Sequence, residues 1–181
     1  MPAYLLLLAA LLSRVVPHSG WFGFTAVGAS LLYFGARRNW HEMLLPVAAF
    51  AALDYYLTTH VYNYPFAVQD YLVTWAWYAA ALALGHILLS TKVSTIRVAS
   101  AALLGPTSFF LVSNYAAWTT LSRPGSMYAP TFSGLITCYV AGLPFYGRDL
   151  VSTALVLAIA FGVPAAIRNF QHDGTTAAQR S

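Results

Sequence analysis

Few residues in this chain could carry chemistry, and one carboxylate is set apart from the rest. Of the five acidic residues, only Asp54 falls inside a long apolar segment. Placing a carboxylate in the hydrocarbon core of a bilayer costs about 2.5–3.5 kcal/mol, even on the scales derived from membrane-insertion experiments. The side chain of Asp54 must therefore face protein or water. Asp54 could therefore bind a ligand or an ion. It could equally cap the end of its helix and bridge to Tyr or Arg side chains.

Two other polar residues in apolar segments need a partner. Arg14 lies one helical turn before Pro17, where it could snorkel to the membrane interface or pair with Asp54 across two helices. Pairing would bring their charged groups within about 4 Å. Asn114 lies late in another segment, and a buried amide requires a hydrogen-bond partner from a neighbouring helix or a ligand. Helix-to-helix bonding is the more common use.

The remaining reactive groups predict neither a metal site nor an enzyme. The five histidines show no i, i+4 pair and no HExxH motif, and the spacing of His18 and His60 specifies no metal site with Asp54. There is no GxSxG motif, no P-loop and no pair of carboxylates in one segment, so we expect no catalysis and no cofactor. The single cysteine, Cys138, lies in an apolar run and is expected to be a buried small hydrophobe.

The elements that position these residues are long and apolar. Apolar residues form 59% of the chain and charged residues only 8%, against about 25% charged in soluble domains. This composition predicts an all-α integral membrane protein. A spanning helix needs about 20 residues, so 181 residues leave room for six spans and no soluble catalytic domain. The apolar segments are 3–16, 24–36, 43–57, 71–89, 98–118, 131–145 and 150–167.

We interpret these segments as a six-transmembrane-helix bundle with an extra short outer-side helix, 131–145, before the last span. Residues 1–168 then form a single transmembrane helical domain, and 169–181 a polar cytoplasmic tail that we expect to be disordered. Basic residues favour cytoplasmic loops. With both termini cytoplasmic, six of the nine basic residues lie inside: Arg37, Arg38, Lys92, Arg97, Arg168 and Arg180. Because the basic residues are scattered along the chain, they do not suggest nucleic-acid binding.

The predicted outer side is rich in aromatic residues. Aromatic walls with a few converging polar groups are typical of sites for small, flat organic molecules, although an interfacial aromatic belt has the same composition. We expect the first loop, 18–23, to cover a cavity on this side. The candidate ligand-binding residues are His18, Trp21, Asp54, His60, Asn114, Trp118 and Tyr139.

Several motifs resemble a family of uncharacterised bacterial membrane proteins. They lie at 14–18 (RVVPH), 24–29 (FTAVGA), 112–118 (VSNYAAW), 128–135 (YAPTFSGL) and 138–145 (CYVAGLPF). In that family an Asn-Phe-Thr-Pro element follows the first motif, and this chain has Gly23 in place of the Asn and Ala26 in place of the Pro. That family is in turn similar to the substrate-binding S components of energy-coupling-factor transporters, which are six-helix proteins whose first loop closes over a vitamin. Pro144-Phe145 before the final helix is similar to their pattern.

The resemblance implies a non-catalytic component that binds a vitamin or metabolite for uptake across the bacterial inner membrane. Its partners would be the lipid bilayer, a small organic ligand and an energising transmembrane/ATPase module. S-component binding residues differ with the substrate, so the resemblance assigns none of them here. The alternative is a structural or accessory subunit of a larger membrane complex. A retained small molecule would favour the first function, and a stoichiometric protein partner the second.

Overall fold

The computed structural model describes residues 1–16, 26–122 and 127–178, and within these ranges the regular secondary structure is helical. Two short 3-10 turns (η1 and η3) and a π-helical turn that continues α3 (η2) complete the elements. The bounds are α1 Pro2–Val15, α2 Val27–Arg37, η1 Trp40–Glu42, α3 Leu44–Tyr56, η2 Leu57–Val61, η3 Val68–Asp70, α4 Leu72–Leu89, α5 Thr95–Leu121 and α6 Phe132–Ala178.

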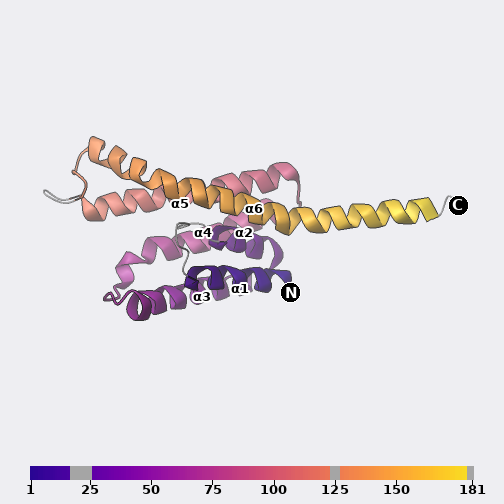
Figure 1. The fold of residues 1–181 in the computed structure, drawn as a ribbon, viewed down its shortest axis with the longest axis horizontal. Coiled ribbons are helices and arrows are strands. Elements are labelled where there is room, and N and C mark those ends of the chain that lie inside the picture. The colour runs from indigo at the N-terminus through magenta and orange to yellow at the C-terminus, as the bar shows by residue number, and fades with distance from the viewer. Residues whose placement is uncertain (17–25, 123–126, 179–181) are drawn as a thin grey trace.

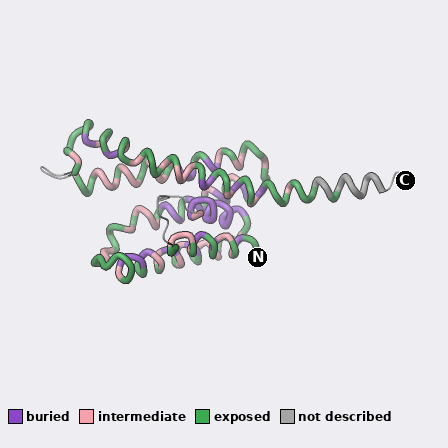
Figure 2. The backbone as a smooth tube through the Cα atoms, viewed as in Figure 1, coloured by how far each residue is buried: buried purple, intermediate pink, exposed green. Residues whose placement is uncertain are grey.

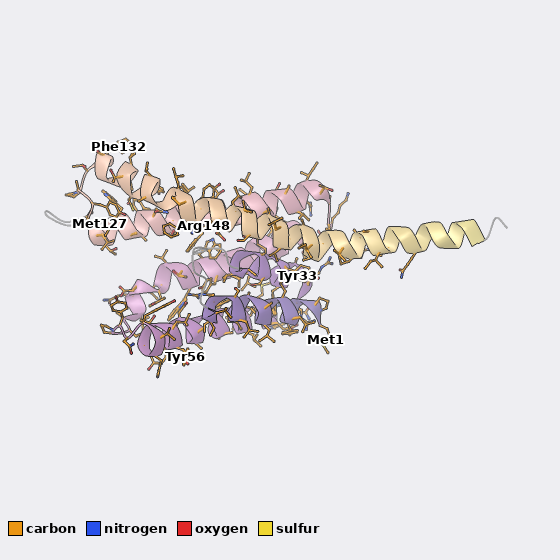
Figure 3. All side chains as sticks on the ribbon, viewed as in Figure 1. Met1, Tyr33, Tyr56, Met127, Phe132 and Arg148 are labelled. Atoms are coloured by element: carbon orange, nitrogen blue, oxygen red, sulfur yellow. The ribbon has the colours of Figure 1, made fainter. Side chains whose placement is uncertain are left out.

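The helices run back and forth along one axis in three layers (Figure 1). The α5–α6 hairpin forms one layer, α1 and α3 form the opposite one, and α2 and α4 lie between them. Tyr56, Met127 and Phe132 mark one end of the bundle, and Met1 and Tyr33 lie toward the other (Figure 3). The two chain termini point toward the same end.

Helix α2 is the centre of the bundle. All residues from Val27 to Ala36 are buried, as the purple tube in Figure 2 shows. At the crossing with α4 the backbones touch: a Cβ atom on Gly35 would lie 2.0 Å from the carbonyl oxygen of Leu82, and one on Gly85 would lie 2.0 Å from that of Leu32. Small residues allow this close approach of helices, so both glycines are required by packing.

Among the described residues, three helices are long and apolar enough to cross a membrane: α4, α5 and the Phe132–Arg168 part of α6. Helix α1 is apolar but shorter, and the 11 residues of α2 extend only about 16 Å, against a hydrocarbon thickness of about 30 Å. The expectation of six spans therefore stays a prediction, whereas the all-helical class is confirmed.

The C-terminal half differs from the sequence interpretation. The segments 131–145 and 150–167 are not two helices, because α6 runs without interruption through Pro144 and Pro164. It also continues to Ala178, into the tail for which we expected disorder. A proline removes one helical hydrogen bond, whereas a full break in apolar surroundings would leave several backbone groups unsatisfied. A continuous helix is therefore the less costly arrangement.

Candidate functional site

A cavity of about 540 Å³ lies among helices α1 to α6. Helices α1 and α3 contribute one lining residue each and α2 contributes two, whereas α4 with the residue before it, α5 and α6 supply the rest. The lining consists of Arg14, Val27, Gly28, Asp54, Tyr71, Thr74, Trp77, Tyr78, Pro106, Phe109, Phe110, Ser113, Asn114, Ala117, Gly142, Phe145, Tyr146 and Asp149.

Helical periodicity explains why these residues meet. On α5 the lining positions are 106, 109, 110, 113, 114 and 117, and on α6 they are 142, 145, 146 and 149. Spacings of three and four residues place side chains on one face of a helix. Each of the two helices therefore turns a single face to the cavity, with aromatic and polar residues interleaved along it.

One wall of the cavity holds a buried ion pair. Arg14 Nη1 lies 2.5 Å from Asp54 Oδ1, and the Asp54 side chain is only 1% exposed. The other carboxylate oxygen accepts a hydrogen bond from Trp75 Nε1 at 2.9 Å and a longer one from the Tyr78 hydroxyl at 3.4 Å. Arg14 Nη1 also donates to the Tyr78 hydroxyl at 3.1 Å. The pairing of Arg14 with Asp54 that we expected from the sequence is present, and it satisfies this carboxylate within the protein.

Two aromatic pairs form the apolar walls. The ring centroids of Trp77 and Phe109 are 4.6 Å apart, and those of Phe110 and Tyr146 are 4.8 Å apart in a stacked arrangement. Hydrogen bonds fix both polar rings, since Trp77 Nε1 donates to Ser108 Oγ at 3.1 Å and the Tyr146 hydroxyl bonds Thr107 Oγ1 at 2.9 Å. The rings are therefore held in place and present preformed apolar surfaces.

A second carboxylate, Asp149, lines the cavity from α6, one residue after the Arg148 labelled in Figure 3. Its Oδ1 accepts a hydrogen bond from Thr153 Oγ1 at 3.5 Å. A Cβ atom on Gly28 would lie 3.7 Å from this oxygen and 3.5 Å from Trp77 Cη2, so the carboxylate and the indole lie close together around Gly28. Within the described part of the chain, the two ion pairs are Arg14–Asp54 and Arg38–Glu42, and neither includes Asp149.

Asn114 also lines the cavity, and it joins α5 to α6. Its Nδ2 donates to the carbonyl oxygen of Phe110 at 2.8 Å, and its carboxamide packs on Gly142, where a Cβ atom would lie 2.5 Å from Asn114 Oδ1. Cys138 is buried, as expected, with Sγ 3.4 Å from the Asn114 carbonyl oxygen. Asn114 thus packs α5 against α6, which is the helix-to-helix use expected from the sequence, and it also lines the cavity.

Three candidate ligand residues lie away from the cavity lining. His60 stacks on Tyr56 with ring centroids 5.2 Å apart. Trp118 Nε1 donates to the carbonyl oxygen of Ala129 at 3.1 Å, and the Tyr139 hydroxyl donates to that of Leu111 at 2.8 Å. The last two are therefore used for contacts between α5 and the chain around α6. His18 and Trp21 lie outside the described residues.

The sequence interpretation missed several lining residues as candidates, chiefly Trp77, Tyr78, Ser113 and Asp149. Asp149 falls between the predicted segments 131–145 and 150–167, whereas in the structure it lies inside α6. The signal that could have identified Asp149 is its position between two apolar segments, since an acidic residue inside an apolar helix must face protein or water. In the described ranges, no group of three or more His, Cys, Asp or Glu side chains is arranged to hold a metal ion.

Comparison with known proteins places the chain in a family. Among curated proteins and among solved structures, none matches it. A model of a family of unknown function, DUF6580, matches residues 1–174. Because the match covers nearly the whole chain, the protein belongs to this family.

Proposed function

We propose that the protein is a multi-pass membrane protein that captures a small organic molecule without chemically changing it. The observation that carries this proposal is the cavity of about 540 Å³ with walls of paired aromatic rings and a few polar groups. Sites for small molecules typically have volumes of about 300–1,000 Å³ and this mixture of apolar walls and directed polar groups. The lining side chains come from six helices, so the ligand would bind between the helices of the bundle.

The proposed topology has six passes, with both termini in the cytoplasm of a bacterial cell. The alternating direction of the helices and the common end of the two termini support it (Figure 1), as does the excess of basic residues on the proposed inner side. Three lining residues, Asp54 in α3, Thr74 in α4 and Tyr71 just before α4, lie near the ends of these helices that face the proposed outer side. A ligand would therefore enter from outside.

The capture step would belong to uptake. The resemblance to S components of energy-coupling-factor transporters supports a role in which this chain binds a vitamin or metabolite and a separate membrane and ATPase module supplies energy. In that role the protein itself needs affinity for the ligand, which can come from aromatic stacking and a few hydrogen bonds.

The proposal is tested by native mass spectrometry of the protein released from lipid nanodiscs. Ser113 lines the cavity, whereas its neighbour Val112 points away and is 50% exposed. We expect a small molecule bound to the wild type and to the Val112→Phe variant, and its loss in Ser113→Phe, because the added ring fills the cavity. A molecule retained equally in both variants, or none in the wild type after mild extraction, would refute capture in this cavity.

The alternative, an accessory subunit of a larger complex, is favoured by one observation. The α5–α6 hairpin carries exposed apolar side chains along its length, such as Leu111, Tyr115 and Val140. In a bilayer these side chains contact lipid or another protein. Co-purification of one protein in a fixed ratio, without a small molecule, would support this alternative.

A further inference from the structure

The charges around the cavity do not balance. Arg14 and Asp54 form a pair at 2.5 Å and neutralise each other, while Asp149 contributes a carboxylate that belongs to neither ion pair of the described residues. If all three groups are ionised, these three side chains leave one negative charge. A carboxylate removed from bulk water is costly unless a positive charge or several hydrogen bonds compensate it.

An aromatic surface lies beside this carboxylate. Gly28 has no Cβ atom, and two side chains lie close to the position where one would be. Trp77 Cη2 is 3.5 Å from that position and Asp149 Oδ1 is 3.7 Å from it. Phe109 backs the indole ring. A cation within about 6 Å of an aromatic ring centroid is attracted by the ring face, most strongly by Trp. A carboxylate next to Trp therefore favours an ammonium group.

We propose that the cavity selects an organic cation, a molecule with an ammonium group on an apolar or aromatic body. The ammonium group binds Asp149 beside Trp77, and the body packs between the Phe109 and Phe110 walls. This inference rests on the proposed function, since it names the ligand class of the same cavity. It assigns different roles to the two carboxylates: Asp54 holds Arg14, and Asp149 binds the ligand.

The test uses three probes of similar size and different charge: phenethylamine, 2-phenylethanol and 3-phenylpropionate. Binding to the full chain in nanodiscs is measured by equilibrium dialysis, with empty nanodiscs subtracted. We expect phenethylamine to bind at least about tenfold more tightly than 2-phenylethanol, and 3-phenylpropionate to bind most weakly. In Asp149→Asn the amine should lose this advantage while the affinity for the alcohol stays the same. The matched control is Asp70→Asn, because Asp70 is exposed and lies outside the cavity lining.

The outcomes separate this inference from the proposed function. One outcome is that 2-phenylethanol binds, that Ser113→Phe blocks this binding, and that phenethylamine binds no more tightly than the alcohol. This outcome refutes the preference for a cation but leaves capture in the cavity standing. An advantage of the amine that survives Asp149→Asn also refutes the inference. If no probe binds, the organic-cation class is refuted, and the mass-spectrometric test of a retained molecule decides the proposed function by itself.

Discussion

The ion pair in the cavity wall makes a quantitative prediction about stability. Replacing Arg14 by Met leaves Asp54 with a side chain that is 1% exposed and no positive partner. Removing one member of a buried ion pair costs about 3–5 kcal/mol, because the other charge stays buried. We expect Arg14→Met to destabilise the protein by about this amount, although the hydrogen bonds from Trp75 and Tyr78 to Asp54 remain.

The opposite substitution should cost less. Asp54→Asn leaves Arg14 unpaired, but its side chain is 25% exposed and can be hydrated from the cavity. The expected loss is that of a charged hydrogen bond, about 1.5–3 kcal/mol. In the double variant neither charge remains, so its cost should fall below the sum of the single costs by about 1–3 kcal/mol.

The assay is unfolding by sodium dodecyl sulfate in mixed micelles, followed by circular dichroism, for the wild type, both single variants and the double variant. The control is the same cycle at Arg38 and Glu42, whose side chains are 33% and 25% exposed, where solvent screening should make the coupling energy much smaller. A coupling energy at Arg14–Asp54 no larger than the control would refute the reasoning. So would a larger loss for Asp54→Asn than for Arg14→Met.

Three further predictions concern packing, pH and topology. Gly35→Ala places a Cβ atom 2.0 Å from a backbone oxygen and should destabilise by about 3 kcal/mol, whereas Gly147→Ala, with nothing within 4 Å, should stabilise by about 0.5–1 kcal/mol in the same unfolding titration. Hydrogen bonds from Tyr4 and, to a smaller extent, from Arg38 hold the pKa of Glu42 in the folded protein below its ordinary value. The ionised Glu42 side chain therefore stabilises the fold fully when the pH is above the ordinary pKa, and this stabilisation is lost as the pH falls through the lower pKa of the folded state. Unfolding midpoints measured from about pH 6 to pH 3 should show this loss in the wild type and not in Glu42→Gln. A cysteine at position 176 should resist a membrane-impermeant thiol reagent in intact cells, and ready labelling would contradict a cytoplasmic C-terminus.

Part of the site could be predicted from composition and position alone. An acidic residue in an apolar segment must find a partner, and Arg14 was a basic residue near the end of another such segment. The sequence therefore offered the Arg14–Asp54 pair as one of two alternatives for Arg14, and the structure contains that pair. The same logic did not extend to Asp149, because this residue falls between the predicted apolar segments 131–145 and 150–167, where Pro144 and Gly147 favour a break between two helices. The cost of breaking a helix in apolar surroundings overrode these local signals, and α6 stayed continuous.

The central position of α2 could not be read from its sequence. The periodicity of a segment cannot tell which helix is surrounded by others. The contacts of Gly35 in α2 and Gly85 in α4 determine this position, because small residues at the crossing allow the backbones of α2 and α4 to touch. The candidates Trp118 and Tyr139 illustrate the same limit. Their residue types suited a ligand site, but their donors reach backbone carbonyls instead.

The two carboxylates of the cavity show how environment separates the roles of identical side chains. Asp54 accepts hydrogen bonds from Arg14, Trp75 and Tyr78, so it has little capacity left for a ligand and its removal should act mainly on stability. Asp149 accepts one long hydrogen bond from Thr153, so its removal should act mainly on binding. Measuring both quantities for Asp54→Asn and Asp149→Asn therefore tests the division directly. A binding loss in the first variant and a stability loss in the second would reverse the assignment of the two roles.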